Sequence, residues 1–494
     1  MNIAASGIDF IRQAEVASRL RRLLSEDAVL SAKEDTRSYE CDGLSAYRQL
    51  PMLVALPSNE DEVRQVLRAC RELKVPVVAR GSGTGLSGGA LPLANGVLLS
   101  LSKMRRILAV DPVARTARVQ PGATNLSISD AAAPYGLFYA PDPSSQIACS
   151  IGGNVAENSG GVHCLKYGLT VHNVLRVRAV TIEGEIVEFG GEALDSPGYD
   201  LLALTIGSEG MLAVVTEVLV KLLPEPETAR VVLASFDDVE RAGNAVAELI
   251  AEGIIPAGLE MMDRPATRAV EDFVHAGYDL EAAALLLCEC DGTPEEVDAQ
   301  MSRVREVLER SGAARLRESS SEAERQKFWA GRKAAFTAMG RISPDYYCMD
   351  GTIPRRRLGE VLLFIGQMEK KYGLRCPNVF HAGDGNLHPL ILFDANDPDQ
   401  LRRTELFAGE VLEKCIEVGG TITGEHGVGI EKINQMCAQF RAPEITAFHA
   451  VKRAFDPEGL LNPGKNIPTL QRCAEFGRMH VRSGQPRHPD LPRF

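Results

Sequence analysis

A glycine-rich segment, Arg80-Gly-Ser-Gly-Thr-Gly-Leu-Ser-Gly-Gly-Ala90, follows a short β-forming run and restricts the fold around it. Within it, Gly83-x-Gly85-x-x-Gly88 has the spacing of a dinucleotide-binding fingerprint, in which a helix begins inside the motif. Gly89 and Pro92 interrupt such a helix, and no acidic residue lies about 20 residues further on to hold a ribose. We therefore predict an open loop between two strands, whose amides can bind a pyrophosphate. The alternative is a glycine-rich turn that binds no ligand.

Two further segments offer small side chains and exposed amides. Residues 141–161, which contain Pro141-Asp-Pro-Ser-Ser145 and Ile151-Gly-Gly-Asn-Val-Ala-Glu-Asn-Ser-Gly-Gly161, are predicted to be loop-like. Ile206-Gly-Ser-Glu-Gly-Met-Leu212 is predicted to turn just before a strand. A large flat cofactor with a pyrophosphate bridge must be contacted by more than one such segment. The three segments together therefore favour a bound cofactor over a glycine-rich turn that binds no ligand.

The composition is ordinary for a globular protein. Of the 494 residues, 45% are hydrophobic and 24% are charged, and the length predicts two or three domains. The net charge of -12 disfavours nucleic acid as a partner, and an anionic substrate would need a local basic pocket. The sequence contains no run of 18 apolar residues, so no membrane-spanning helix is expected. Near the N-terminus, Asp9 and Glu15 interrupt any apolar core of a signal peptide. The expected location is therefore cytoplasmic.

The cysteines predict neither disulfides nor a cluster. There are 11 of them, an odd number in a large chain without a predicted signal peptide, which indicates reduced thiols. No Cys-x-x-Cys motif occurs, and the closest pair, Cys288 and Cys290, lies in an apolar run. An iron–sulfur cluster or a cysteine-type zinc site held by this chain alone is therefore not expected.

Pro224-Glu-Pro-Glu227 is the clearest boundary, because two prolines break regular structure and the charges keep the segment in solvent. We predict three parts: residues 1–224, residues 225–415, and residues 416–494, which complete the active site and pack on the first part. In the second part strand-like and helical runs alternate, which predicts an α+β domain with its own antiparallel sheet. Residues 421–468 are predicted to hold only short elements and turns, and the last 25 residues a loosely ordered tail.

The expected elements follow from hydrophobic periodicity. In the first part, strands are predicted near residues 75–79, 97–101, 107–111, 117–120, 174–182, 185–189 and 212–222. In the second part, strands at 231–236, 258–261, 283–290 and 346–353 alternate with helices at 238–252, 294–311, 321–340 and 357–372.

Two short motifs near the C-terminal end combine three imidazoles with a carboxylate: His381-Ala-Gly-Asp-Gly-Asn-Leu-His388 and Gly424-Glu425-His426-Gly427. His381 and His388 would face opposite sides of one straight strand. Asp384-Gly385 is a turn signal, so we expect the chain to fold back and bring both rings together. With Glu425 as third ligand, the set predicts a divalent metal site that suits zinc, and also iron or manganese. The alternative for each histidine is a structural hydrogen bond.

Long strings of the sequence resemble one family of flavoenzymes. They are Cys149-Ser-Ile-Gly-Gly-Asn-Val-Ala-Glu-Asn158, Tyr346-Tyr-Cys-Met-Asp-Gly-Thr-Ile-Pro354 and Glu431-Lys-Ile-Asn-Gln-Met-Cys437. With the glycine-rich loop and the histidine motifs in this order, the chain resembles the FAD-linked 2-hydroxy-acid dehydrogenases of the vanillyl-alcohol oxidase fold, and among them the large FAD-binding subunits of bacterial glycolate oxidase. The resemblance runs from Tyr39 to Ile467. It implies an α+β fold with a PCMH-type FAD-binding domain followed by a cap domain.

The resemblance implies FAD as the cofactor, with its pyrophosphate on residues 81–88 and its isoalloxazine ring at the boundary with the cap domain. Some relatives attach the flavin to a histidine in the first loop. This chain has no histidine there, so we expect non-covalent FAD. The residues expected to bind it are Arg80, Gly81, Ser82, Gly83, Thr84, Gly85, Leu86, Ser87, Pro141, Asp142, Ser145, Gly152, Gly153, Asn158, Gly161, Glu209, Gly210 and Asn462.

The resemblance also implies oxidation of a 2-hydroxy acid beside the metal, which is usually zinc in these dehydrogenases. His426 is expected to take the proton from the substrate hydroxyl, so that a hydride passes from the α-carbon to flavin N5. Arg332, on a predicted helix with the only tryptophan, is expected to bind the substrate carboxylate, the alternative being a solvated helix charge. Relatives that act on dicarboxylic hydroxy acids carry polar groups at the positions of Phe336 and Cys348. A small monocarboxylate, such as glycolate or D-lactate, is therefore expected.

Reduced FAD must be reoxidised, either by oxygen or by a partner. The resemblance implies a complex with a second, smaller FAD-binding subunit and an iron–sulfur subunit that pass electrons to quinone, so the chain would reach the inner membrane only through its partners. Two alternatives stay open: a D-lactate dehydrogenase that acts alone, and a non-catalytic flavin-binding scaffold subunit. The scaffold subunit is not expected to carry His381, His388, Glu425 and His426.

Overall fold

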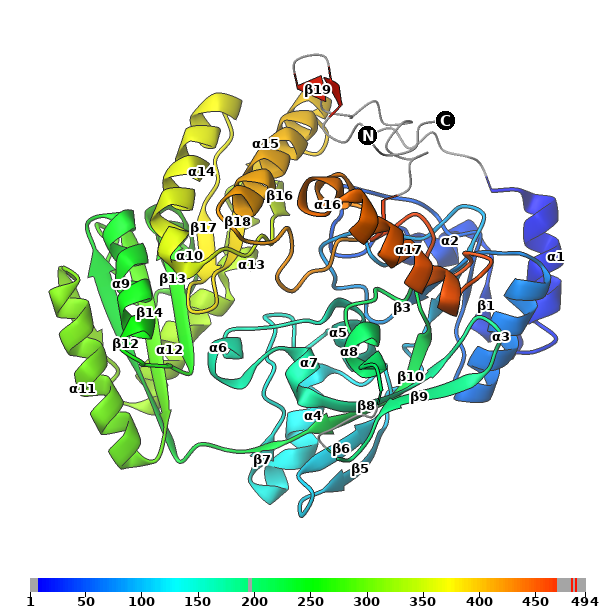
Figure 1. The fold of residues 1–494 in the computed structure, drawn as a ribbon, viewed down its shortest axis with the longest axis horizontal. Helices are drawn as coiled ribbons and strands as arrows, with labels where there is room; N and C mark the ends of the chain where they lie inside the picture. The colour runs from blue at the N-terminus through cyan, green and yellow to red at the C-terminus, as the bar shows by residue number, and fades with distance from the viewer. Residues whose placement is uncertain (1–7, 194–197, 469–480, 483–484, 487–494) are drawn as a thin grey trace. The chain divides into compact units, whose positions relative to one another are not determined.

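The computed structural model describes residues 8–193, 198–468, 481–482 and 485–486, and the contacts divide the chain into two units (Figure 1). The first unit comprises Met1–Ser159, Leu169–Pro224 and His426–Phe494, and the second comprises Gly160–Gly168 and Glu225–Glu425. The chain thus enters the second unit at the predicted boundary after Pro224. Residues 160–168 and 416–425 also belong to the second unit, although we expected them in the flanking parts.

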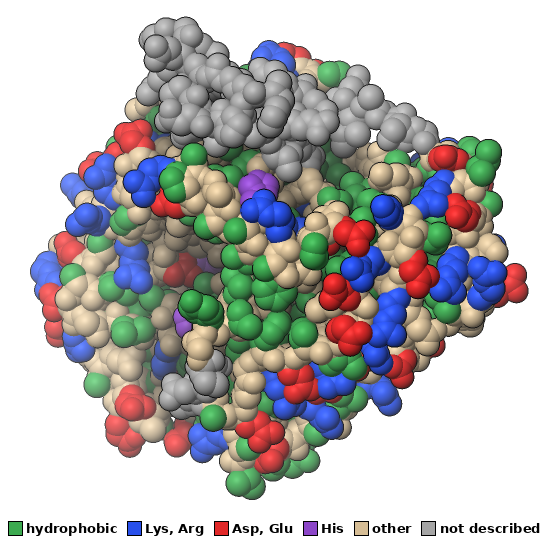
Figure 2. Space-filling view, turned by 45° about the vertical axis from the view of Figure 1, so that its right-hand side comes forward, with side chains coloured by type: hydrophobic (Ala, Val, Ile, Leu, Met, Phe, Trp, Pro, Cys, Tyr) green, Lys and Arg blue, Asp and Glu red, His purple; other side chains and the backbone are tan. Residues whose placement is uncertain are grey.

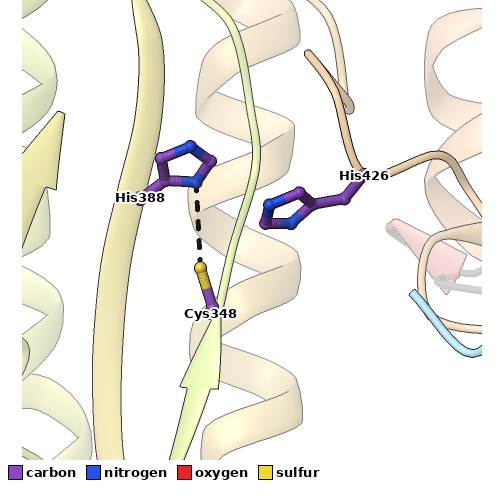
Figure 3. A group of neighbouring side chains, drawn as sticks. All are labelled: Cys348, His388 and His426. Atoms are coloured by element: carbon purple, nitrogen blue, oxygen red, sulfur yellow. Dashed lines mark hydrogen bonds between the residues drawn. The ribbon is translucent and has the colours of Figure 1, made fainter. Parts of the chain in front are cut away.

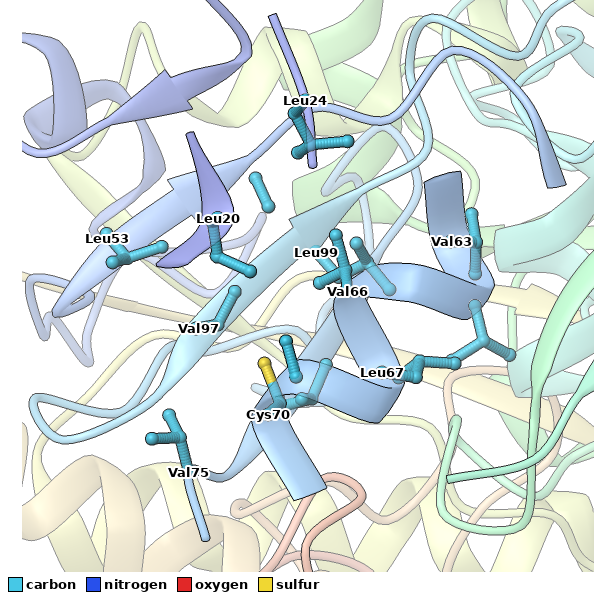
Figure 4. Close-up of a cluster of buried hydrophobic side chains, with 14 of the residues drawn as sticks. Leu20, Leu24, Leu53, Val63, Val66, Leu67, Cys70, Val75, Val97 and Leu99 are labelled. Atoms are coloured by element: carbon cyan, nitrogen blue, oxygen red, sulfur yellow. The ribbon is translucent and has the colours of Figure 1, made fainter. Parts of the chain in front are cut away.

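The first sheet of the first unit is built on a parallel β–α–β arrangement. Its strand order is β1 (Val29–Leu30), β2 (Leu53–Ala55), β4 (Val97–Ser100) and β3 (Val77–Arg80), with β4 parallel to both β2 and β3. The core in Figure 4 joins these strands to α1 (Phe10–Leu20) and α3 (Glu60–Glu72) through Leu20, Leu53, Val63, Val66, Leu67, Val97 and Leu99. Residues 81–96 therefore connect two neighbouring parallel strands without a helix, as predicted.

The second sheet of the first unit is antiparallel and confirms the strands expected there. Its order is β5 (Ile107–Asp111), β6 (Thr116–Val119), β10 (Val214–Lys221), β8 (Val174–Val180) and β9 (Ile186–Gly190). Around it lie the short helices α4 (Asn125–Ala132), α7 (Thr170–Asn173) and α8 (Leu201–Thr205) and the two-stranded pair β7 (Leu137–Phe138) and β11 (Leu223–Pro224).

The prediction of a loop over residues 141–161 is wrong in its second half, because α5 (Ile151–Glu157) is a helix. Ile151 and Val155, four residues apart, are fully buried in the core of the second sheet. Gly152 lies so close to Pro121 that a Cβ would come within 2.7 Å of the proline Cβ. Burial of one apolar edge and close packing at the glycine thus outweigh the poor helix propensity of two consecutive glycines.

The C-terminal part of the first unit contains more helix than the sequence predicted. α16 (Ile433–Gln439) is short, but α17 (Ala442–Phe455) runs for 14 residues. Only Ile445 and Lys452 of α17 are buried, and the Lys452 ammonium donates to Asp456 Oδ2 at 2.6 Å, so the apolar periodicity is weak. Of the predicted tail, only the short strands β19 (Val481–Arg482) and β20 (Gln485–Pro486) lie within the described residues.

The second unit contains one antiparallel sheet, as expected for the cap domain. Its order is β15 (Arg315–Glu318), β12 (Thr228–Phe236), β14 (Ala284–Gly292), β13 (Gly258–Asp263), β17 (Asn378–His381), β18 (Asn386–Phe393) and β16 (Asp345–Cys348). The helices are α6 (Cys164–Tyr167), α9 (Val239–Ala251), α10 (Arg264–Val274), α11 (Pro294–Arg310), α12 (Glu322–Lys333), α13 (Ala335–Met339), α14 (Leu358–Tyr372) and α15 (Pro398–Glu417). β13, β17 and β18 are buried along their whole length, so both faces of the sheet are covered.

On the face drawn in Figure 2, acidic and basic side chains are interspersed rather than gathered by sign. None of the helices among the described residues is both long and apolar enough to cross a membrane.

Candidate functional site

The two predicted histidine ligands lie on the hairpin of β17 and β18. His381 pairs with Asn386 and Val379 pairs with His388 across the hairpin, so both histidines point to one face. Gly385 has a φ of +83°, a conformation that favours glycine, and allows the tight turn between the strands. The two ring centroids are 4.9 Å apart. The expected fold-back is confirmed.

Glu425 joins the two rings. Its Oε1 lies 3.2 Å from His381 Nε2 and 2.9 Å from His388 Nε2. Its backbone is held by the fully buried Asp350, whose Oδ1 accepts from the Glu425 amide at 3.1 Å and from Asn386 Nδ2 at 2.9 Å. The structure therefore brings the three predicted ligands together, with their ligand atoms within 4.8 Å of one another.

The other nitrogen of each ring has its own acceptor. His381 Nδ1 lies 2.9 and 3.0 Å from the two oxygens of Glu260, and His388 Nδ1 lies 3.2 Å from the Met349 carbonyl. His388 Nδ1 also contacts Cys348 Sγ at 3.8 Å, a contact drawn in Figure 3 together with His426. These acceptors favour protons on both Nδ1 atoms and direct both Nε2 atoms at the Glu425 carboxylate, where each is a metal ligand in its unprotonated form. Two imidazoles and one carboxylate so arranged fit a zinc-type ion between them.

The electrostatics of the cluster favour positive charge at this point. Burial opposes a charged imidazole, but the carboxylates of Glu260 and Glu425 outweigh it and raise the pKa of His381 well above its ordinary value. Burial likewise favours a neutral Glu425, but His381 and His388 hold the pKa of that carboxyl well below its usual range. In the turn, burial raises the pKa of Asp384 to about 6. A cation is thus stabilised between the rings and the glutamate.

Arg332 is not a solvated helix charge. It lies near the end of α12 and is fully buried, with Nη2 2.6 Å from Glu260 Oε2. Its Nε and Nη1 are buried and have no hydrogen-bond partner among the described residues. Buried guanidinium donors without acceptors are costly, so this edge of Arg332 is suited to an anionic ligand.

Glu260 is a site residue that the sequence analysis missed. The register of β13 on β17 pairs Met262 with Val379 and Met261 with Phe380, which places Glu260 opposite His381 at the next step. The signal was a glutamate inside the otherwise apolar run predicted as a strand at 258–261. A carboxylate in the middle of a buried strand requires polar partners, and here they are an imidazole and a guanidinium.

Two uncharged side chains border His388. The Phe336 ring centroid lies 6.3 Å from the His388 ring, and Cys348 borders the same imidazole. Both residues are those at which a polar group was expected for dicarboxylic substrates. No charged side chain is therefore contributed from these two positions.

In the first unit, the glycine-rich loop presents free amides. The backbone N–H groups of Gly83, Thr84, Gly85 and Leu86 donate to no other described residue, and all four residues are partly exposed. The Ser82 amide donates to Ser150 Oγ at 3.2 Å, which fixes the start of the loop against the beginning of α5. A row of unused amides in a partly exposed loop fits an anion such as a pyrophosphate.

Several residues predicted to bind the cofactor hold the loops in place. Arg80 donates from Nη1 to the Cys41 carbonyl at 2.7 Å, beneath the loop. Asn158 ends α5 with a φ of +55° and accepts from the Val171 amide at 2.9 Å. Asn462 Nδ2 donates to the carbonyls of Gly89 and Glu209 at 3.0 and 2.7 Å.

The remaining predicted cofactor residues divide between the units. Pro141, Asp142, Ser145, Gly152, Gly153 and Gly210 lie in the first unit, and Gly161 alone lies in the second. The Pro141 carbonyl accepts from Asn125 Nδ2 at 2.9 Å, which anchors the segment that begins at Pro141 to α4.

Glu209 fixes the segment that follows His426. Its two oxygens accept from the amides of Val428 and Gly429 at 2.7 and 2.8 Å, and the Lys432 ammonium donates to the Gly427 carbonyl at 2.7 Å. Burial raises the pKa of Glu209, and these two amides act in the opposite direction. His426 itself follows Glu425 in the chain and is the first residue of the C-terminal segment of the first unit.

Two family models match the chain, and the second begins where the chain enters the second unit. The model of an FAD binding domain matches residues 51–190, and that of FAD linked oxidases, C-terminal domain, matches residues 225–466. The chain is 62% identical to the glycolate oxidase subunit GlcD of Escherichia coli (strain K12), over 98% of this chain and 97% of that relative. It is 32% identical to a D-lactate dehydrogenase of Anaerostipes hadrus, over 88% of this chain and 94% of that relative.

The fold also matches a solved structure. p-Cresol methylhydroxylase aligns with a TM-score of 0.79 at 17% identity, covering 94% of this chain and 98% of that one. At this identity the likeness concerns the fold alone, and it confirms the predicted fold class. The sequence matches carry the family assignment. The chain belongs to the FAD-linked oxidases, in the family that includes the glycolate oxidase subunit GlcD.

Proposed function

We propose that the chain oxidises a small 2-hydroxy acid, with FAD as the electron acceptor and a divalent metal, zinc by preference, at the substrate site. The convergence of His381, His388 and Glu425 beside the buried Arg332 carries this proposal. The names of the relatives, glycolate oxidase subunit and D-lactate dehydrogenase, support the substrate class.

Each residue has a separate task in this proposal. His381 Nε2, His388 Nε2 and Glu425 hold the metal. When bound, the metal lowers the pKa of a substrate hydroxyl, and FAD accepts a hydride. The free edge of Arg332 binds the substrate carboxylate, which fixes the α-carbon. His426 receives the hydroxyl proton as general base.

The substrate is a small monocarboxylate. Phe336 and Cys348 border His388 and offer no charge to a second carboxylate. Glycolate and D-lactate both meet this condition, and the D-lactate dehydrogenase relatives favour D-lactate as a second substrate. A dicarboxylic hydroxy acid would bury an unpaired charge there.

FAD binds without a covalent link. The unused amides of residues 83–86 supply donors for its pyrophosphate, and no histidine occurs in residues 80–90 to attach the ring. The predicted residues that hold the loops, Arg80, Asn158, Glu209 and Asn462, contribute by shaping the site.

The electrons leave through partner proteins. The name of the 62% identical relative, a glycolate oxidase subunit, supports a complex, in which a second FAD-binding subunit and an iron–sulfur subunit pass electrons to quinone. The chain would then sit at the inner membrane through those partners. Purification of a tagged chain from its native host should recover an iron–sulfur protein; recovery of the chain alone, active with D-lactate, would favour an enzyme that acts by itself.

The proposal is tested by anaerobic reduction of the bound flavin. Glycolate, D-lactate, L-lactate and a dicarboxylic 2-hydroxy acid are added in turn to the purified protein, and the oxidised-flavin absorbance is followed. Bleaching by glycolate or D-lactate, and little or none by the dicarboxylic acid, is expected. A flavin band that no 2-hydroxy acid changes would contradict the proposal and favour the non-catalytic scaffold.

A further inference from the structure

Glu260 contacts both His381, one of the three candidate metal ligands, and Arg332. One oxygen lies 2.9 Å from His381 Nδ1, and the other lies 3.0 Å from the same nitrogen and 2.6 Å from Arg332 Nη2. Glu260 and Arg332 are each about 1% exposed at the side chain, so solvent can replace neither contact. The strand register and the last turn of α12 bring these three groups together.

We propose that Glu260 is a positioning residue for the reaction. Its one carboxylate orients both the imidazole of His381 and the guanidinium of Arg332. The inference rests on the proposed function, because it assigns Glu260 to the residues that hold the metal and the substrate there. By accepting the Nδ1 proton, Glu260 keeps the Nε2 lone pair of His381 directed toward Glu425 and makes that nitrogen a better ligand. By pairing with Nη2, it turns the Nε and Nη1 edge of Arg332 away from itself.

A competing explanation is that Glu260 and Arg332 form a buried ion pair that serves stability alone. Buried ion pairs are weak evidence for stability, because desolvation offsets much of their attraction. The structural explanation also gives no reason why the carboxylate should meet the one histidine nitrogen that is not directed at Glu425. It predicts that metal affinity is indifferent to the charge at position 260.

The chain offers a matched control on the neighbouring strand. Glu289 of β14 lies opposite Gly258, two residues from Glu260 along β13, and therefore faces the same side of the sheet. It too meets a histidine and an arginine: His163 Nε2 at 3.1 Å and Arg325 Nη1 at 2.7 Å. It contacts neither histidine of the hairpin.

The experiment compares zinc affinity among variants of the full chain. Wild type, Glu260→Gln, Glu289→Gln and Arg332→Met are stripped with a chelator, and zinc binding is measured by competition with a chromophoric chelator. FAD content and the flavin spectrum are recorded for each. Because Glu260→Gln leaves Arg332 without a counter-charge and could fail to fold, the double variant with Glu260→Gln and Arg332→Met is included.

The expected result is a zinc affinity about 10- to 100-fold lower in Glu260→Gln and in the double variant, with unchanged FAD content. Glu289→Gln and Arg332→Met should keep the affinity of the wild type within about threefold, because His381 retains its carboxylate in both. Equal affinity in wild type and the double variant would overturn the inference, as would an equal loss in Glu289→Gln. A wild-type chain that binds no zinc, cobalt or manganese would overturn the proposed metal site itself, and this inference with it.

Discussion

Two buried charges of the first unit and two of the second take different partners. In the first unit, Glu209 and Lys465 bind the backbone: Glu209 accepts from two amides, and the Lys465 ammonium donates to the carbonyls of Gly89 and Leu91 at 2.9 and 2.5 Å. In the second unit, Glu260 and Glu289 bind other side chains: Glu260 holds an imidazole and a guanidinium, and Glu289 holds an imidazole, a guanidinium and an indole.

The difference follows from what each unit presents. The first unit offers a row of backbone amides, so its buried charges fix loops whose own side chains are small. The second offers imidazoles and a carboxylate, so its buried charges orient side chains. Substitution of Glu209 should therefore act through stability, and substitution of Glu425 or Arg332 through metal and substrate binding. The following predictions test this contrast.

Removal of the shared ligand should have the largest effect. Glu425→Ala leaves two imidazoles, too few to hold a metal firmly, so the rate of flavin reduction by glycolate should fall about a thousandfold or more. FAD content should stay at the wild-type level, because the unused amides of residues 83–86 lie in the first unit and Glu425 lies in the second. Stopped-flow flavin reduction and metal analysis measure both effects; a variant that keeps its metal and its rate would remove Glu425 from the site.

Glu209→Ala should act on stability instead. It leaves the amides of Val428 and Gly429 buried without an acceptor, which should cost about 2–5 kcal/mol of the free energy of unfolding. Denaturant unfolding followed by flavin fluorescence measures this loss, and Glu209→Gln, which retains one acceptor, should lose less. Zinc affinity should not change. If Glu209→Ala lowered zinc affinity strongly and left the free energy of unfolding unchanged, the proposed difference between Glu209 and the residues of the histidine site would be contradicted.

The Glu289 network should be sensitive to acid. Burial favours its neutral form, but His163 and Arg325 outweigh burial and lower the pKa of Glu289 from 4.5 to about 2. A depressed pKa stabilises the fold above pH 4.5, and this contribution, up to about 3 kcal/mol, is lost as the pH falls toward about 2. The excess stability of wild type over Glu289→Gln should therefore shrink between pH 6 and pH 3. Fluorescence of Trp329, the only tryptophan, reports unfolding; a constant difference would contradict the assigned charge.

Arg332→Met should weaken substrate binding. Loss of a charge-assisted pair with the substrate carboxylate, about 1.5–3 kcal/mol, corresponds to a KM about 10- to 100-fold higher for glycolate. Steady-state kinetics with an artificial electron acceptor measures KM, and metal content serves as the internal control. An unchanged KM would mean that Arg332 pairs with Glu260 but does not bind the substrate carboxylate.

Gly152→Ala should have the smallest effect. Its Cβ would lie 2.7 Å from the Pro121 Cβ and 3.0 Å from the Pro121 carbonyl oxygen, so the start of α5 must shift at a cost of about 1–3 kcal/mol. Gly366 in α14 has open space around its missing Cβ, so Gly366→Ala should stabilise by up to about 1 kcal/mol. Thermal unfolding compares the pair. Equal stability of both variants would mean that Gly152 is needed for the cofactor rather than for packing.

What could be predicted from the sequence follows the same division. The hairpin of His381 and His388 was predictable, because a turn signal lies between two ligand-type residues, and the open loop at 81–96 was predictable from glycine and proline positions. Glu260 was not, because its role depends on the pairing of β13 with β17, strands far apart in the chain. α5 was missed because the contact of Gly152 with Pro121 is tertiary, and α17 because a buried lysine replaces part of its apolar stripe.

The most direct test of the metal site is restoration by metal after chelation. The wild-type chain is stripped with a chelator, and flavin bleaching by glycolate is followed before and after addition of one equivalent of zinc, with Glu425→Ala treated in parallel. The account predicts that stripping abolishes bleaching while FAD stays bound, and that zinc restores it in the wild type alone. Full bleaching by the stripped wild-type protein would contradict a role for His381, His388 and Glu425 as metal ligands in the reaction.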